Sequence, residues 1–418
     1  MLKRWIPEFT WVALGKLSSL LGSVILVKFL THSLDLIEYA QITLGLTICN
    51  FFTQVIMGAL GQGIGRVYVD AASRSDFSGF KKSLFNINKS VILLYIYLIA
   101  AALLAGLLFG LQQWMPFALI LIVYSYVYGL NDISAGLQNL ARNRKQSVLA
   151  GLIEIVIKLV LIYGLVRIFD LGVLSVVIIY LLASLIALMY QVRVFEMLET
   201  LPATAANDKK VSDWRQQIFL ISTPAAFAGI FVWLQQASDK WALNYFHGSE
   251  SVAQYTVVYQ LGYAPFLIGM GVVMSLLTPV IYKTQKRSIM KKLLIFVLGI
   301  TALGIVFSVA YFEKLFAFIV DIRYVAASKY LPFMLVSAGL FQAGEIVSSQ
   351  MMGENRSKDI FKVKMLAACV CVMSNTLGAY LYGIPGVVGS MIVFGLTYFV
   401  LFMAFLVSKN STGVCDGK

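Results

Sequence analysis

Apolar segments of about twenty residues follow one another along almost the whole chain of 418 residues. A segment of that length spans the hydrocarbon core of a bilayer as an α-helix, which satisfies its backbone hydrogen bonds internally. Only 13% of the residues are charged and 60% are apolar, whereas a soluble chain carries about 25% charged residues. The sequence therefore predicts an all-α polytopic membrane protein and excludes a water-soluble globular enzyme.

The apolar segments form two sets of six. The twelve expected transmembrane helices are residues 10–30, 39–60, 91–111, 115–136, 148–168 and 171–192, then 217–237, 255–282, 293–312, 331–352, 363–381 and 387–407. Shifting the chain by 216 residues lays the first segment on the seventh and Tyr39 on Tyr255. This repeat predicts two six-helix lobes, 1–192 and 217–408, with a cytoplasmic linker at 193–216 and a cytoplasmic tail at 409–418.

The basic residues indicate the orientation of the chain, because cytoplasmic loops of membrane proteins are enriched in Lys and Arg. With both termini in the cytoplasm, most of the 33 basic residues lie in cytoplasmic loops. Only Arg167, Lys314, Arg323 and Lys329 then lie in outer loops. The net charge of +13 therefore reflects an N-in and C-in topology and not a nucleic-acid surface.

Ionisable residues inside the expected helices are the first candidates for function, because a charge in lipid is costly. Lys16 lies about two turns into the first segment, on a face that also carries Ser19 and Ser23, and Lys28 lies near the outer end. A cationic face of small residues suits an anion in a central cavity. The alternative is that each lysine extends to the membrane interface.

The second segment carries polar and small residues at helical spacing. Its stripe consists of Thr43, Thr47, Asn50, Gln54, Gly58, Gly61 and Gly65, and Arg66 follows at the cytoplasmic end. The stripe either lines a wet passage, with Arg66 as an anion contact, or forms a helix-packing seam. The sequence leaves both interpretations open.

Two further helices carry carboxylates. Glu154 and Lys158 are four residues apart on the fifth segment, so they can neutralise each other. The pair is either structural or a coupling site that opens when a proton or a substrate phosphate competes. Glu345 on the tenth segment has no basic partner in its own helix, which makes it a candidate proton site.

A cluster of polar residues lies where the seventh segment ends and the eighth begins. Gln235, Asp239 and Lys240 follow one another closely, and Tyr255 and Tyr259 are four residues apart. Amide, charged and phenolic groups that face a cavity suit a polar glycan. The alternatives are an interfacial aromatic belt for Tyr255 and ordinary packing for the others.

These features together resemble a known family. They are the basic face of the first segment, the stretch SDKWALNYF at 238–246, the following Ala253-Gln254-Tyr255, and the matching Ile37-Glu38-Tyr39. Through these features the chain resembles polysaccharide flippases of the multidrug/oligosaccharidyl-lipid/polysaccharide exporter superfamily. Among these it resembles most of all the bacterial O-antigen (Wzx-type) flippases. The resemblance covers nearly the whole chain, through diffuse motifs.

The resemblance implies a V-shaped bundle in the bacterial inner membrane. Such a bundle moves undecaprenyl-diphosphate-linked O-antigen repeat units from the cytoplasmic to the periplasmic leaflet by alternating access, for lipopolysaccharide biosynthesis. A polysaccharide polymerase and a chain-length regulator are the implied protein partners. By similarity, the diphosphate is expected to bind Lys16, Lys28, Arg66 and Lys240. The glycan is expected to bind Asn50, Gln54, Gln235, Asp239, Tyr255 and Tyr259.

Two other functions remain open from the sequence. A proton- or sodium-coupled drug or small-molecule antiporter of the same fold is expected to carry an acidic residue in the first segment, where the charged residues are only lysines. A membrane polysaccharide polymerase needs a large periplasmic loop, and the expected outer loops are short. Cys369 and Cys371 lack the spacing of a metal site, so no metal or cofactor is expected.

Overall fold

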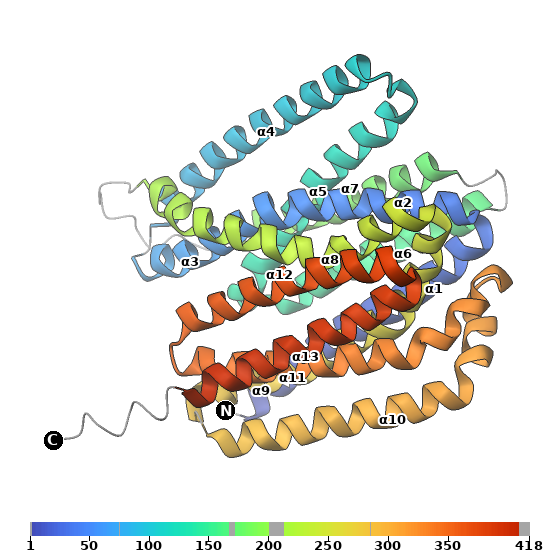
Figure 1. The fold of residues 1–418 in the computed structure, drawn as a ribbon. Coiled ribbons are helices and arrows are strands. Elements are labelled where there is room, and N and C mark those ends of the chain that lie inside the picture. The colour runs from blue at the N-terminus through green and yellow to red at the C-terminus, as the bar shows by residue number, and fades with distance from the viewer. Residues whose placement is uncertain (1, 75, 167–171, 200–212, 285, 409–418) are drawn as a thin grey trace. The chain divides into compact units, whose positions relative to one another are not determined.

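The structure, a computed structural model, describes residues 2–74, 76–166, 172–199, 213–284 and 286–408, and nearly all of them are helical (Figure 1). The first part of the chain forms α1 (Leu2–Ser33), α2 (Leu36–Phe52), η1 (Thr53–Gly58), α3 (Ala59–Ser73), α4 (Phe77–Leu108), η2 (Gln112–Trp114), α5 (Met115–Leu140), α6 (Arg144–Val166) and α7 (Val173–Glu199). The second part forms α8 (Arg215–Val258), η3 (Tyr259–Tyr263), α9 (Ala264–Thr284), α10 (Arg287–Ile319), η4 (Ile322–Tyr330), α11 (Leu331–Gly353), α12 (Ser357–Tyr382) and α13 (Ile384–Ser408). The predicted all-α fold is confirmed.

Within the described ranges, 11 helices are long and apolar enough to cross a membrane. One of these, Arg215–Ser275, has 61 residues, which at about 1.5 Å per residue is roughly three times the thickness of a hydrocarbon core. Its backbone leaves the helical conformation at Gly248, with φ 78°, a left-handed value that glycine adopts without steric cost. Each side of Gly248 is long enough to span, so the described parts of all twelve expected segments are helical, apart from a few residues at segment ends. Residues 167, 168 and 171 of two of these segments lie outside the described residues.

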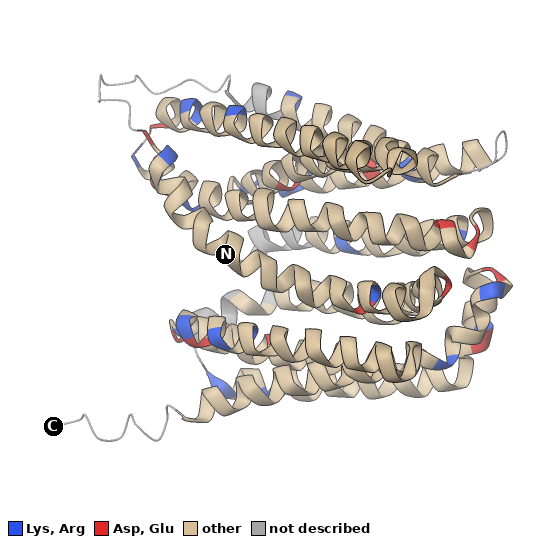
Figure 2. Cartoon of the chain, turned by 45° about the horizontal axis from the view of Figure 1, so that its top comes forward, with Lys and Arg blue, Asp and Glu red and all other residues tan. Residues whose placement is uncertain are grey.

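The helices extend beyond the apolar segments that predict them. α4 begins at Phe77, where Asp76 caps it by accepting a hydrogen bond from the Gly79 amide, and α3 continues to Ser73. Figure 2 shows Lys, Arg, Asp and Glu mainly toward helix ends, with long uncharged middles. Hydropathy identifies only the part of a helix that lies in lipid, so it misses the polar turns that continue the helix into water.

The chain forms two compact units that do not coincide with the two halves of the sequence. Unit 1 comprises the described residues of 1–15 and 44–233, and unit 2 those of 16–43 and 234–418. α1 therefore passes from unit 1 to unit 2 at Lys16, and α8 does so after Trp233. The units differ from the predicted lobes in segments 16–43 and 217–233, so the lobe boundaries 1–192 and 217–408 stay a prediction. Most of the predicted linker and the tail at 409–418 lie outside the described residues.

The core of unit 1 is formed by α3, α4, α5 and the start of α8. Its buried side chains include Ile64, Phe80, Ile122 and Ile218. Gly63 lets α8 approach α3 closely, because a Cβ there would lie 2.6 Å from the Ile218 carbonyl oxygen. Small residues at such crossings are typical of helices packed within a membrane.

The core of unit 2 is formed by α9 to α13. Met270, Val297, Ile346 and Phe402 are among its buried side chains. α12 and α13 approach each other closely at Gly378 and at Gly386 in α13, where a Cβ on the second glycine would lie 1.9 Å from the carbonyl oxygen of the first. Only glycine permits this approach, so the crossing of these two helices depends on it.

Two of the membrane segments contain a π-helical turn. η1 interrupts α2 and α3, and η3 interrupts α8 and α9. A π turn adds one residue to the helical repeat and is frequent at functional sites. Gln54 lies in η1 and Tyr259 in η3, so each turn contains a residue predicted to bind the glycan.

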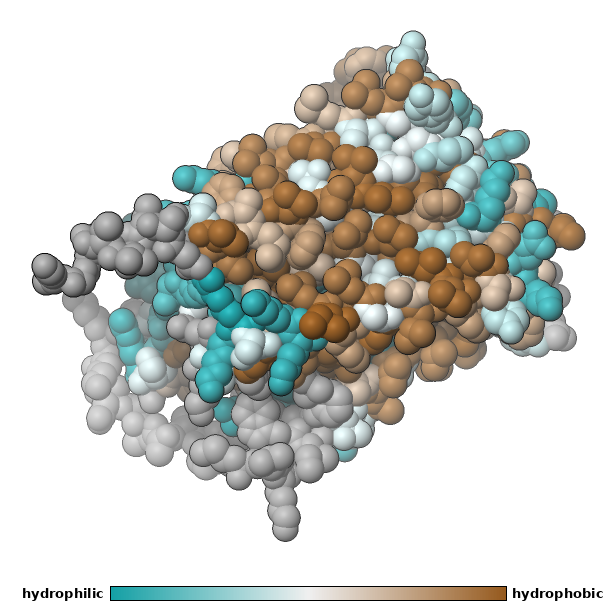
Figure 3. Space-filling view, turned by 60° about the horizontal axis from the view of Figure 1, so that its bottom comes forward, coloured by the Kyte–Doolittle hydropathy of each residue, from teal (hydrophilic) through white to brown (hydrophobic). Residues whose placement is uncertain are grey.

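Large apolar side chains are exposed on the outer surfaces of the helices. Leu108, Leu220, Ile295 and Leu303 are examples, and Figure 3 shows apolar side chains over much of one face. An apolar surface of this extent is unfavourable in water and favourable against lipid chains. Together with the long helices, it identifies a multi-pass membrane protein.

Candidate functional site

Unit 1 contains a buried ion pair within α6. The Lys158 Nζ lies 2.6 Å from Glu154 Oε1, one turn away on the same helix. The ammonium also lies 4.6 Å from the ring centroid of Tyr180 on α7 and 5.9 Å from that of Tyr124 on α5. Both charges are thus compensated inside the helix bundle, as the four-residue spacing predicted.

Unit 2 contains a second buried pair on α8. The Lys240 Nζ lies 3.2 Å from Asp239 Oδ2, and the Tyr255 hydroxyl donates to the same oxygen at 2.7 Å. The ammonium also donates to the Gln236 carbonyl at 3.2 Å and lies 4.6 Å from the centroid of the Tyr259 ring. Four of the predicted ligand residues therefore contact one another.

These contacts bear on the predicted roles of the α8 residues. Asp239 is 1% exposed and Lys240 is 7% exposed, and their charges offset each other. A diphosphate that bound Lys240 would have to separate it from Asp239 and leave that carboxylate uncompensated. The assignments of Lys240 to the diphosphate and of Asp239, Tyr255 and Tyr259 to the glycan remain predictions, and the geometry favours a structural network.

A third acid–lysine pair joins α11 to α12. The Lys364 Nζ lies 3.3 Å from Glu345 Oε1, and the Tyr398 hydroxyl of α13 donates to the same oxygen. The sequence prediction of no basic partner within the helix of Glu345 is correct, but the partner comes from the neighbouring helix. Lys364 is the second residue of the expected segment 363–381, where hydropathy does not separate a loop lysine from a helical one, whereas α12 begins at Ser357.

Packing around this third pair positions its groups. A Cβ at Gly344 would lie 2.4 Å from the ring of Tyr398, so glycine is required for that ring to approach α11 beside Glu345. The Gln235 side-chain amide donates to the Lys364 carbonyl at 3.3 Å, which ties α8 to α12. Gln235 therefore contacts the backbone of the lysine that pairs with Glu345.

Aromatic rings connect the second and third pairs within unit 2. The ring of Tyr259 stacks on that of Tyr263 with 4.9 Å between centroids. Tyr263 lies 6.3 Å from Phe341, which in turn stacks on Tyr398 at 4.8 Å. The row leads from the Lys240 ammonium, beside Tyr259, to the Glu345 carboxylate, beside Tyr398.

Lys28 is engaged with the end of another helix. Its Nζ donates to the Phe318 carbonyl at 3.0 Å and lies 4.5 Å from the centroid of the Phe318 ring. Phe318 belongs to the last turn of α10, where carbonyl groups lack partners within the helix. The geometry thus gives Lys28 a capping role, and its assignment to the diphosphate remains a prediction.

Lys16 and Arg66 differ from the other candidate cations. Both side chains are exposed, and among the described residues neither has a hydrogen-bond or ion-pair partner. Lys16 lies in the span Thr10–Ser33, and Arg66 lies in α3, within the span Leu36–Ser73. These two basic side chains therefore remain available to an anionic ligand.

The polar stripe of α2 and η1 is partly a packing seam. A Cβ at Gly229 of α8 would lie 3.1 Å from the Gln54 carbonyl oxygen, and the Trp233 indole donates to the Thr47 carbonyl at 2.7 Å. α8 therefore packs on this stripe. Asn50 is exposed and Gln54 is half-buried, and their predicted roles in glycan binding stay predictions.

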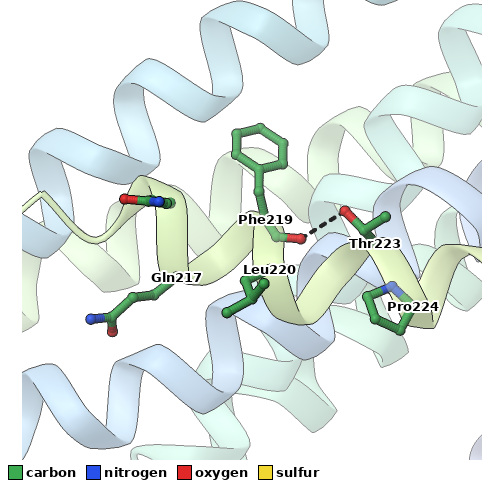
Figure 4. A pocket seen from close by; sticks show the side chains of 6 residues that line it. Gln217, Phe219, Leu220, Thr223 and Pro224 are labelled. Carbon is green, nitrogen blue, oxygen red and sulfur yellow. Dashed lines mark hydrogen bonds between the residues drawn. The ribbon is translucent and has the colours of Figure 1, made fainter.

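A separate pocket lies along the beginning of α8 (Figure 4). It is lined by Gln216, Gln217, Phe219, Leu220, Thr223 and Pro224, and the Thr223 hydroxyl donates to the Phe219 carbonyl at 2.8 Å. None of the predicted site residues is among the lining residues. No group of three or more metal-ligating side chains occurs in the part of the chain that the structure describes.

Comparison with solved structures places the chain among known transporter folds. The lipid II flippase MurJ, in an inward closed conformation, aligns with a TM-score of 0.73 at 14% identity, over 96% of this chain and 87% of that chain. A mutant of the MATE transporter VcmN from Vibrio cholerae aligns with a TM-score of 0.68 at 17% identity, over 98% and 97% of the two chains. A MOP superfamily transporter from Pyrococcus furiosus aligns with a TM-score of 0.62 at 16% identity, over 97% and 95%.

Sequence comparison adds no closer assignment, since no family model matches the chain and no curated protein matches it significantly. The likeness to MurJ and to the MATE transporters extends over nearly the whole length of the chain. At these identities it establishes the architecture. The chain has the same fold as these solved transporter structures.

Proposed function

We propose that the chain is a flippase that moves undecaprenyl-diphosphate-linked oligosaccharide repeat units of the O-antigen type across the bacterial inner membrane. Solved structures with this fold are described in inward-facing and in outward-facing conformations, which supports alternating access. Among the solved structures that share it is one named as a lipid II flippase. We extend that likeness to this chain because Lys16 and Arg66 have no acidic partner among the described residues.

The observation that carries the proposal is the exposure of Lys16 and Arg66 without an acidic partner. A cation inside a membrane helix is unfavourable unless a partner or water compensates it. A diphosphate supplies that partner, because charge-assisted contacts with phosphate are strong and a low dielectric strengthens them. The remaining lysines of the membrane segments discussed above are already engaged.

A coupled drug antiporter of the same fold is the rival function, and the MATE transporters among the similar structures favour it. A cationic drug would need a carboxylate that is free to receive it. Glu154, Asp239 and Glu345 each contact a lysine instead. At these three positions the arrangement favours an anionic substrate over a cationic one.

The proposal is tested in a strain that lacks this chain and is complemented with variants. Lys16→Ala and Arg66→Ala each remove one phosphate contact, which is worth roughly 10- to 100-fold in affinity. Surface polysaccharide is expected to fall and lipid-linked repeat units to accumulate. Both are measured by gel electrophoresis of the polysaccharide and by mass spectrometry of the lipid extract.

Lys82→Ala is the matched control, because Lys82 is an exposed lysine on a membrane helix, near the N-terminal end of α4. It is expected to leave both quantities unchanged at equal protein levels. If Lys16→Ala and Arg66→Ala behave like Lys82→Ala, the cationic recognition of a lipid diphosphate is wrong.

A further inference from the structure

The pair Glu345–Lys364, here called the open pair, differs from the other acid–lysine pairs in its exposure. Its side chains are 41% exposed for Lys364 and 30% exposed for Glu345. The corresponding values are 11% and 12% for Lys158 and Glu154, and 9% and 1% for Lys240 and Asp239. The open pair is therefore the one of the three that a ligand can reach without first disrupting the helix bundle.

Both members of the open pair lie within membrane segments. Lys364 is seven residues beyond Ser357, the first residue of α12, which corresponds to about 10 Å of helix. Glu345 lies inside α11. Lys364 is the second residue of the apolar segment 363–381. A charge within a membrane segment is costly without a partner, so the loss of one member changes the protonation or the hydration of the other.

The carboxyl group has one engaged oxygen and one oxygen that can carry a proton. Lys364 and Tyr398 both contact Oε1 of Glu345. If Lys364 moves away, protonation at Oε2 leaves Oε1 as the carbonyl oxygen that still accepts the Tyr398 hydrogen bond. Protonation of Glu345 therefore leaves its hydrogen bond with Tyr398 intact.

The other ionisable groups around Glu345 do not replace Lys364. Tyr398 faces it from α13, and Tyr263 interacts with it from η3. The next carboxylate along the chain, Glu354 at the C-cap of α11, contacts Arg287 and Arg356 at 3.9 Å each. Within the described residues, Lys364 is thus the cation that compensates Glu345.

We propose that the substrate's diphosphate group takes the ammonium of Lys364 from Glu345, and that Glu345 then binds one proton from the aqueous solution. Release of the diphosphate reverses both steps, so the number of protons and charges is conserved over a cycle. Binding of the anion is thereby linked to uptake of a proton at the same site. This inference rests on the proposed function and assigns Lys364 as a further substrate contact.

The test uses the full-length chain in nanodiscs of neutral phosphatidylcholine, with farnesyl diphosphate and inorganic pyrophosphate as probes. Binding is titrated calorimetrically at pH 7 in buffers of different ionisation enthalpy, which reports the protons taken up. We expect about one proton per bound farnesyl diphosphate, as the proposed linkage requires. Glu345→Gln is expected to bind the probe without proton uptake.

Lys364→Gln is expected to weaken binding roughly 10- to 100-fold. Lys362→Gln, a change at an exposed lysine two residues away on α12, is the matched control and should leave affinity and proton uptake unchanged. A response to farnesyl diphosphate alone identifies a lipid-linked substrate. A response to pyrophosphate as well shows that the diphosphate group is sufficient, and both results support the inference.

Binding without proton uptake, or proton uptake that persists in Glu345→Gln, would overturn the inference and leave the flippase proposal intact. If Lys364→Gln binds as tightly as the native chain, the lysine is not a substrate contact. If the native chain binds neither probe, the flippase proposal and the inference both fail.

Discussion

The pairs Glu154–Lys158 and Asp239–Lys240, here called the sealed pairs, contrast with the open pair Glu345–Lys364. In each sealed pair a tyrosine ring lies 4.6 Å from the ammonium, and both charged groups are buried. In the open pair both side chains are partly exposed. The same two chemical groups are therefore largely inaccessible to solvent in the sealed pairs and partly accessible in the open pair.

The contrast follows from the desolvation of the charges. Separating a buried pair leaves an uncompensated charge in a low dielectric, whereas a partly exposed pair is solvated by water when it opens. A site that must release its substrate has to be of the second kind. Of the three pairs, only Glu345–Lys364 meets that condition.

The largest effect is expected when one member of a sealed pair is removed. Lys158→Met leaves Glu154 buried without a cation and should destabilise the protein by about 3–5 kcal/mol. The double variant Glu154→Gln with Lys158→Met removes both charges and should recover most of that loss. The free energy of unfolding is measured in mixed detergent and SDS micelles.

The open pair supplies the control for this experiment. Lys364→Gln should change the free energy of unfolding by less than about 1 kcal/mol, because the partly exposed carboxyl group of Glu345 is reached by water and takes up a proton in place of its lost partner. If Lys364→Gln and Lys158→Met destabilise the protein equally, the distinction between sealed and open pairs has no energetic basis.

A smaller effect is expected at an ion pair whose carboxylate lies between two membrane segments. Asp321 lies between α10 and η4, and its Oδ1 is 2.7 Å from the Arg323 Nε. Burial opposes ionisation of this carboxyl, but the hydrogen bonds and charge of Arg323 outweigh it and lower the pKa of Asp321 below its ordinary value. Arg323 also donates to the Thr31 and Leu34 carbonyls, so the pair joins η4 to the end of α1.

The pH dependence of stability follows from the lowered pKa of Asp321. A lowered pKa means that the ionised form stabilises the folded state above the ordinary pKa, and that this contribution is lost as the pH falls through the lowered value. Asp321→Asn should therefore reduce the difference in melting temperature between pH 7 and pH 3. If the native chain and Asp321→Asn lose the same melting temperature between pH 7 and pH 3, the Asp321–Arg323 pair does not contribute to the pH dependence of stability.

Much of the fold could be predicted from the sequence, because transmembrane length and apolar composition are local properties. The twelve expected segments, including the one on each side of Gly248, appear as helices. The pairing of Glu154 with Lys158 was also predictable, since residues four apart share a helix face. The division of the chain into units was not, because α1 and α8 each contribute to both, and only tertiary packing determines that.

Several contacts of the candidate site had no signal in the sequence. Asp239 and Lys240 are adjacent, and adjacent residues on a helix do not face each other, so their ion pair was not expected. The contact of Lys28 with Phe318 joins residues 290 positions apart. Lys364 lay at the edge of an apolar segment, where hydropathy cannot separate a loop lysine from one inside a helix.

The most direct test of the flippase proposal measures translocation in reconstituted vesicles. Undecaprenyl-diphosphate-linked oligosaccharide is placed in the outer leaflet, and its loss of accessibility to an impermeant glycosidase is followed. Vesicles that contain the native chain should lose accessible substrate faster than empty vesicles, and Lys16→Ala with Arg66→Ala should slow this rate by about tenfold or more. Equal rates in native and empty vesicles, under an imposed pH gradient of either direction, would contradict the proposal.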